Sequence, residues 1–71
     1  MNILITAMLP QECRIKICCD ADMLPRIKQI AGVTRVTQNA LFTNQYIVHL
    51  SDTVDIGIVR ARLEGLNREH A

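Results

Sequence analysis

The segment from Cys13 to Cys19 constrains the fold more than any other part of the chain. Its side chains fall into two alternating sets: Cys13, Ile15, Ile17 and Cys19 on one side, and Arg14, Lys16 and Cys18 on the other. Successive side chains of an extended strand point to opposite faces of a sheet, so this spacing predicts a strand with one buried face. The chain therefore has to build a sheet that is covered on one side and open on the other.

Three further strands are expected, and two turns join the strands into hairpins. The strands are Asn2 to Met8, Val33 to Phe42 and Tyr46 to Leu50. Pro10-Gln11-Glu12 folds the first of them against the Cys13 to Cys19 segment, and Thr43-Asn44-Gln45 joins the other two. Alternation along the last strand places Tyr46, Val48 and Leu50 on the covered face of the sheet.

Two helices are expected to cover this sheet. The first runs from Met23 to Ala31, with Asp22 as N-cap and Gly32 as stop, because Pro25 is tolerated only in a first helical turn. The buried stripe of this helix should consist of Leu24, Ile27, Ile30 and Ala31. Ser51, Asp52 or Thr53 caps the second helix, whose apolar stripe consists of Ile56, Val59, Leu63 and Leu66.

These elements predict one α+β domain over residues 1–71, in the order strand, strand, helix, strand, strand, helix. From Cys13 onward this order is the ferredoxin-like plan without its last strand. In that plan, the last strand lies antiparallel beside the first, at an edge of the sheet. The Asn2 to Met8 strand can take this position, which predicts a permuted ferredoxin-like fold with four antiparallel strands and both helices on one face.

The segment Ile30-Ala31-Gly32-Val33-Thr34-Arg35-Val36, followed by a hairpin and the Tyr46 to Leu50 strand, resembles the middle of small ferredoxin-like modules. Such modules include ACT and related ligand-sensing domains and the heavy-metal-associated copper chaperones. The resemblance covers Cys13 to about Leu66 and implies the fold given above. The chaperones carry Cys-x-x-Cys before their first helix, where this chain has Cys18-Cys19-Asp20-Ala21-Asp22-Met23. ACT domains carry a glycine-containing loop there, whereas the first glycine of this chain is Gly32.

Composition narrows the classes of function. A formal net charge of +1 gives no strong electrostatic reason to expect nucleic acid or an anionic membrane as partner. The three cysteines form no natural intrachain pair, and no secretory leader pattern is visible, so we expect a reduced, cytoplasmic protein. The apolar run from Ile3 to Leu9 is far shorter than the roughly 20 residues of a membrane span. No catalytic motif or cofactor loop is present, and we expect neither an enzyme nor a cofactor.

Cys18 and Cys19 stand just before the first expected helix. The positive end of a helix dipole can lower the pKa of a thiol, and two thiolates with Met23 could hold a soft metal ion. A metal-binding or redox protein that uses Cys18 and Cys19 is therefore one alternative. Against it, neighbouring side chains of a strand point to opposite faces, which leaves Cys19 as an ordinary core residue.

The open face of the sheet offers the second candidate surface. It should carry Arg14, Lys16, Arg35, Ile47 and His49. Weak nucleic-acid binding through this face is a further alternative, but RNA-binding sheets of this topology stack bases on aromatic residues of the central strands. The aromatic residues here are Phe42 and Tyr46, both near the hairpin tip.

The leading hypothesis is a small non-enzymatic interaction or regulatory module that presents a surface to a protein partner or to a second copy of itself. A small domain buries little apolar surface, and Ile47, Ile58 and one side of the first strand remain exposed. The two edges of the sheet contain no proline within a strand that would deter pairing. The sequence therefore predicts a homodimer, formed edge to edge or by packing of the open faces around Ile47.

Overall fold

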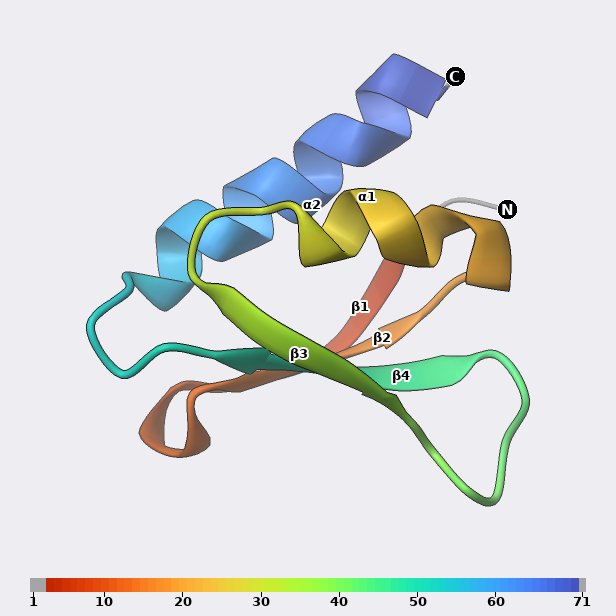
Figure 1. Cartoon of the computed structure of the whole chain (residues 1–71), viewed down its shortest axis with the longest axis horizontal. Helices are drawn as coiled ribbons and strands as arrows, with labels where there is room; N and C mark the ends of the chain where they lie inside the picture. The colour runs from red at the N-terminus through yellow and green to blue at the C-terminus, as the bar shows by residue number, and fades with distance from the viewer. Residues whose placement is uncertain (1–2, 71) are drawn as a thin grey trace.

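Four antiparallel strands form one sheet in the order β1-β2-β4-β3, and two helices lie over one of its faces (Figure 1). The computed structural model describes residues 3–70, with side chains for residues 3–68. The elements are β1 (Leu4–Leu9), a 3-10 turn η1 (Pro10–Glu12), β2 (Arg14–Cys18), a 3-10 turn η2 (Ala21–Met23), α1 (Leu24–Lys28), β3 (Val33–Gln38), β4 (Gln45–Leu50) and α2 (Ile56–His70). The predicted α+β class, with a four-stranded antiparallel sheet and two helices, is confirmed.

The pairing of the two central strands confirms the predicted facing of their side chains. Ile15 lies opposite Val48 and Ile17 opposite Tyr46, and all four side chains are buried under the helices. The intervening positions of β2 and β4 therefore point to the open side of the sheet. Both boundaries of β2 differ from the prediction by one residue. Cys13 has a φ of 54° and ends the turn before β2 instead of beginning the strand, and β2 ends at Cys18 instead of Cys19.

The first helix is shorter than predicted. A 3-10 turn over Ala21–Met23 precedes α1, which ends at Lys28 instead of Ala31. The prediction of Asp22 as N-cap is wrong, because Met23 takes that position and no side chain caps the helix. Ile27 is fully buried, whereas Ala31 is exposed and lies outside the helix, so its place in the buried stripe was also wrong.

Gly32 reverses the chain between α1 and β3. Its φ of 96° is in the region that L side chains rarely adopt, and a Cβ at this position would collide with the side chain of Val54. Its carbonyl oxygen accepts a hydrogen bond of 2.8 Å from the backbone N–H of Ser51. Glycine is required here by conformation and by space. The prediction that Gly32 stops the helix was wrong, because α1 already ends at Lys28 and Gly32 belongs to the turn that follows.

Asp55 caps α2, contrary to the prediction that Ser51, Asp52 or Thr53 would do so. The Asp55 carboxylate accepts a hydrogen bond of 2.8 Å from the backbone N–H of Gly57. Ser51 and Thr53 instead bond to each other within the preceding loop, at 2.8 Å. The predicted stripe is confirmed: Val59 and Leu63 are fully buried, while Ile56 and Leu66 pack against the same core.

The loop between β3 and β4 is longer than predicted. The strand ends at Gln38, because the side-chain Oδ1 of Asn39 accepts a hydrogen bond of 2.9 Å from the N–H of Leu41 and bends the chain there. Leu41 and Phe42, which were expected within the strand, lie in this loop and are 83% and 54% exposed. Gln45, expected in the turn, is the first residue of β4.

Asn67 of α2 holds the beginning of β1. Its Oδ1 accepts a hydrogen bond of 2.6 Å from the N–H of Ile3, and its Nδ2 donates one of 2.9 Å to the carbonyl oxygen of Ile3. Ile3 is buried, so these two bonds satisfy backbone groups that water reaches poorly. β1 begins at Leu4, and the predicted start at Asn2 lies outside the described residues.

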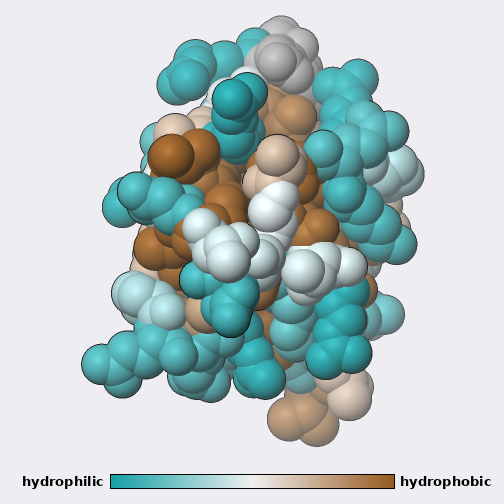
Figure 2. Space-filling model, turned by 60° about the vertical axis from the view of Figure 1, so that its left-hand side comes forward, coloured by the Kyte–Doolittle hydropathy of each residue, from teal (hydrophilic) through white to brown (hydrophobic). Residues whose placement is uncertain are grey.

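Hydrophobic side chains also reach the surface. Turned toward the left-hand side of Figure 1, the molecule shows such side chains in the middle of the view, with hydrophilic ones on both sides (Figure 2). Among the described residues, Leu4 of β1 and Ile58 of α2 are 63% and 56% exposed. No helix in the described part of the chain is long and apolar enough to cross a membrane.

Candidate interaction face

The open side of the sheet brings together all five residues that the sequence assigned to it. Arg14 of β2 and Arg35 of β3 are both paired with His49 of β4, which lies between them. In the next row of the sheet, Lys16 of β2 is paired with Ile47 of β4. We call these five residues the open-face cluster: three cations and a histidine placed around one partly exposed isoleucine.

The open-face cluster has little negative charge near it. The four described strands contain no Asp or Glu. Glu12, in the turn before β2, places a carboxylate oxygen 3.7 Å from the guanidinium of Arg14, and the side chains of Arg14 and Glu12 are 43% and 57% exposed. Such an exposed pair is weak, about 0–1 kcal/mol, so Arg14 remains available to another anion. Lys16 and Arg35 are exposed and have no ion-pair partner among the described side chains.

His49 is tied to the sheet and kept neutral by its surroundings. A hydrogen bond of 2.9 Å joins its Nε2 to the hydroxyl of Thr37 on β3. Burial lowers the pKa of His49 below its ordinary value of 6.5, and the positive charges of Arg35 and Arg14 lower it further. The ring is therefore uncharged at neutral pH, and Arg14, Lys16 and Arg35 supply the positive charge of the cluster.

Both edge strands contain a bulge that the sequence did not reveal. The extra residue is Thr6 in β1 and Thr34 in β3. Each hydroxyl donates a hydrogen bond of 3.1 Å to a carbonyl oxygen of the neighbouring central strand, from Thr6 to Lys16 and from Thr34 to His49. Bulges twist an edge and interrupt its row of free backbone groups, which hinders the addition of another strand. No residue type in the sequence marks these positions, because threonine is also common in regular strands.

The two neighbouring cysteines face opposite sides of the sheet. Cys19 belongs to the buried core, whereas Cys18 is partly exposed and is paired with Leu4 and Gln45. Burial raises the pKa of the Cys19 thiol to about 11, with smaller contributions from Asp20, Cys18 and Asp22. The expectation that the helix would lower the pKa was therefore wrong for Cys19. No group of three or more His, Cys, Asp or Glu side chains in the described part of the chain could hold a metal ion.

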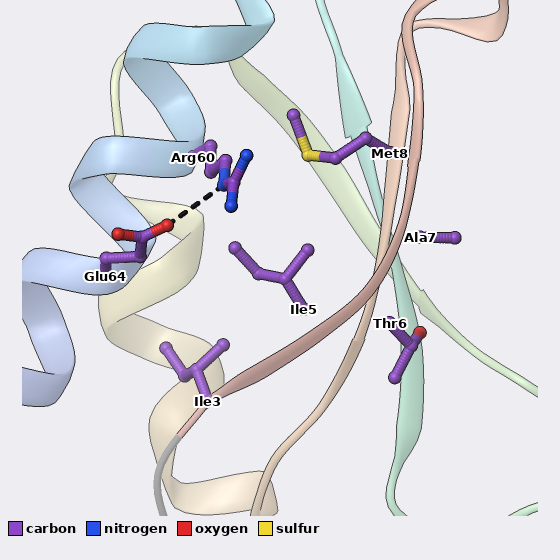
Figure 3. A pocket seen from close by; sticks show the side chains of 7 residues that line it. All are labelled: Ile3, Ile5, Thr6, Ala7, Met8, Arg60 and Glu64. Atoms are coloured by element: carbon purple, nitrogen blue, oxygen red, sulfur yellow. Dashed lines mark hydrogen bonds and ion pairs between the residues drawn. The ribbon is translucent and has the colours of Figure 1, made fainter.

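A small cavity of about 300 Å³ lies where β1 meets α2 (Figure 3). Ile3, Ile5 and Met8 point from β1 toward the helix, while Thr6 and Ala7 point away from it. Arg60 Nε donates a hydrogen bond of 3.0 Å to Glu64 Oε1 on the helix side of this cavity. The two residues are four apart on α2, a spacing that places them on the same side of the helix. Because its charges cancel and the opposite wall is apolar, the cavity resembles a packing seam more than a binding site.

Comparison of the chain with protein-family models, with curated proteins and with solved structures found no match.

Proposed function

We propose that this protein is a small non-enzymatic interaction module, built on a permuted ferredoxin-like plan, that binds an acidic surface of a protein partner. The observation that carries the proposal is the open-face cluster: Arg14, Lys16 and Arg35 surround Ile47 on strands that contain no Asp or Glu. The helices cover the other face of the sheet, and no helix of the described chain lies over this side (Figure 1). Arginine beside an exposed apolar residue is a common composition for the centre of a protein interface.

The charge of the cluster favours a partner of opposite sign. Three cations on one face attract an acidic surface during the encounter and penalise partners that carry basic groups. Two copies of this chain packed with their open faces together would bring six cations onto one interface. Like charges make that form of the homodimer unfavourable, and the bulges at Thr6 and Thr34 hinder the edge-to-edge form.

Self-association through β1 remains a second candidate, because Leu4 is 63% exposed at this edge. A dimer formed there would cover an apolar side chain and add burial to a small core. Light scattering of the full-length chain at micromolar to millimolar concentration tests it. A dimer that becomes a monomer in Leu4→Lys supports this version, whereas a folded monomer throughout removes it.

A capture experiment tests the principal proposal. The tagged protein and a Lys16→Glu/Arg35→Glu variant are incubated with a lysate from their source cells at low and at moderate salt. We expect a captured acidic protein that is lost in the variant and weakened by salt, because the attraction between exposed charges is screened. Lys28→Glu/Arg60→Glu is the matched control, since it changes the net charge equally but lies outside the open face.

Two results would contradict the proposal. Equal loss of the captured protein in both double variants would show that net charge matters and the open face does not. Captured material that nuclease releases would assign the face to nucleic acid, although Tyr46 is buried in the core and Phe42 lies in the loop, so the open side offers no aromatic platform among the described residues.

A further inference from the structure

A groove of about 540 Å³ is lined by residues of α1, of the turn that follows it and of α2. Both helices belong to the layer of the molecule opposite the open sheet face (Figure 1). The floor of the groove includes Ile30, Leu66 and Gly65, which are all partly buried. Three arginines line it: Arg26 from α1, and Arg62 and Arg68 from α2. The volume lies within the range of about 300–1,000 Å³ that is usual for small-molecule sites.

No acidic residue among the described residues that line this groove balances the positive charge of its three arginines. The cavity on the other side of α2 provides a comparison, because there the cation Arg60 is paired with Glu64 at 3.0 Å. Arg26, Arg62 and Arg68 have no ion pair with any acidic side chain that the structure describes. Three guanidinium groups around one groove repel one another, and a bound anion would relieve this repulsion.

Gly65 gives a second reason to regard the groove as a site. A Cβ built at this position meets no atom closer than the guanidinium of Arg68, at 3.8 Å. Neither backbone conformation nor packing in the protein therefore requires glycine at Gly65, in contrast to Gly32. Glycine is unfavourable relative to alanine in the interior of a helix, and its presence here keeps the floor of the groove open.

We propose that this groove binds a small organic polyanion. Phosphate or carboxylate groups of the ligand pair with Arg26, Arg62 and Arg68, because the planar fork of arginine matches both anions with two parallel hydrogen bonds. An apolar or aromatic body lies over Gly65, between Ile30 and Leu66. The site is independent of the open-face cluster, so either proposal can fail without the other.

Binding of two probes tests the charge requirement. Pyranine, a planar aromatic trisulfonate, is followed by fluorescence, and inorganic pyrophosphate by calorimetry. We expect both to bind the full-length protein, and an Arg26→Gln/Arg62→Gln variant to bind each about tenfold more weakly or worse. Lys28→Gln/Lys16→Gln loses the same net charge outside the groove and should bind both probes as the unchanged protein does. Absence of binding, or equal weakening in both variants, would overturn the proposal.

Gly65→Ala tests the position of the ligand body. Alanine should raise the melting temperature of the protein, because it favours the helix and has room. The added methyl group should nevertheless weaken pyranine binding and leave pyrophosphate binding unchanged, since pyrophosphate has no body over the floor. Unchanged pyranine binding would overturn the proposed pose. A short poly-glutamate peptide that bound more tightly than pyranine would instead assign the groove to an acidic protein segment.

Discussion

The two faces of the sheet are built from the same strands and have opposite compositions. On the covered face, Ile15, Ile17 and Val48 are buried and touch the helices. One residue away along the same strands, Lys16 and Ile47 face solvent. The alternation of a strand thus separates the residues that hold the fold from those that are free to meet a partner, and substitutions on the two faces should have different effects.

The covered face should respond most strongly to truncation. Leu63→Ala removes a fully buried side chain from the contact between α2 and the sheet, and it should lower the free energy of unfolding by about 2–4 kcal/mol. Exposed Arg62→Ala, on the same helix, should change it by less than about 0.5 kcal/mol. Urea unfolding measures both. An equal effect of the two changes would show that α2 does not use this side to cover the sheet.

The contact of Asn67 with Ile3 should contribute less than the core but more than any surface pair. Asn67→Ala leaves the N–H and the C=O of buried Ile3 without these partners, which should cost about 1–3 kcal/mol. The amide of Ile3 should also exchange with deuterium much faster. Exposed Arg68→Ala serves as the control, and exchange at Ile3 that is as slow in Asn67→Ala as in the unchanged protein would contradict the assigned bonds.

The reactivities of the neighbouring thiols Cys18 and Cys19 allow the two faces of the sheet to be compared directly. Cys19 is fully buried and its thiol pKa is raised to about 11, whereas Cys18 is partly exposed. In the native state a thiol reagent should therefore modify Cys18 at least about tenfold faster, because Cys19 reacts only after the structure opens. Peptide mass spectrometry after timed labelling identifies the modified residue. Faster modification of Cys19 would show that the facing is wrong.

The same sample can test the metal alternative. A zinc complex that survives dialysis and is lost in Cys18→Ser would support a thiolate site, and it would require Cys19 to leave the core.

The smallest expected effect concerns the pH dependence that His49 gives to stability. Its pKa is lowered in the folded state, so the unfolded chain binds the proton more tightly. His49 should have no effect on stability above its ordinary pKa of 6.5 and should destabilise the protein as pH falls below that value, until the folded residue is protonated too. Between about pH 7.5 and about pH 5, the free energy of unfolding should therefore change less with pH in His49→Gln than in the unchanged protein.

A matched change tests the cause of this shift. NMR titration of His49 in Arg35→Gln should give a higher pKa than in the unchanged protein, because one of the nearby positive charges has been removed. A pKa that stayed the same or fell would leave burial and Arg14 as the causes of the shift and would place Arg35 farther from the ring than its pairing on the sheet indicates.

The features that the sequence predicted correctly depend on local periodicity. Alternation in Cys13 to Cys19 identified the buried face, because a single strand suffices to define the two sides. The incorrect predictions concern choices among similar residues, such as Asp55 as the cap of α2 in place of its polar neighbours in the preceding loop. Several side chains in that loop have the chemistry of a helix cap, so the backbone geometry decides which of them caps α2.

The groove between the helices could not have been found by periodicity. Arg26 belongs to α1 and Arg62 to α2. The sequence placed both helices on one face of the sheet, but nothing near either residue indicates that these two side chains line the same groove. The bulges at Thr6 and Thr34 were not predicted for a related reason, since an extra residue in one strand is defined only by the register of that strand with its neighbour. The open-face cluster was predictable because it needed only the strand order and the alternation.

The two hydrogen bonds between Asn67 and Ile3 indicate where a circular permutation of the chain could join its ends. They bring the last turns of α2 within bonding distance of the start of β1, across 64 positions of sequence. A chain opened in the Pro10–Glu12 turn, with α2 joined to β1 by a short linker, would read strand, helix, strand, strand, helix, strand and would keep every neighbour in the sheet. In the natural order, the side chain of Asn67 makes this junction by hydrogen bonds, without a covalent link.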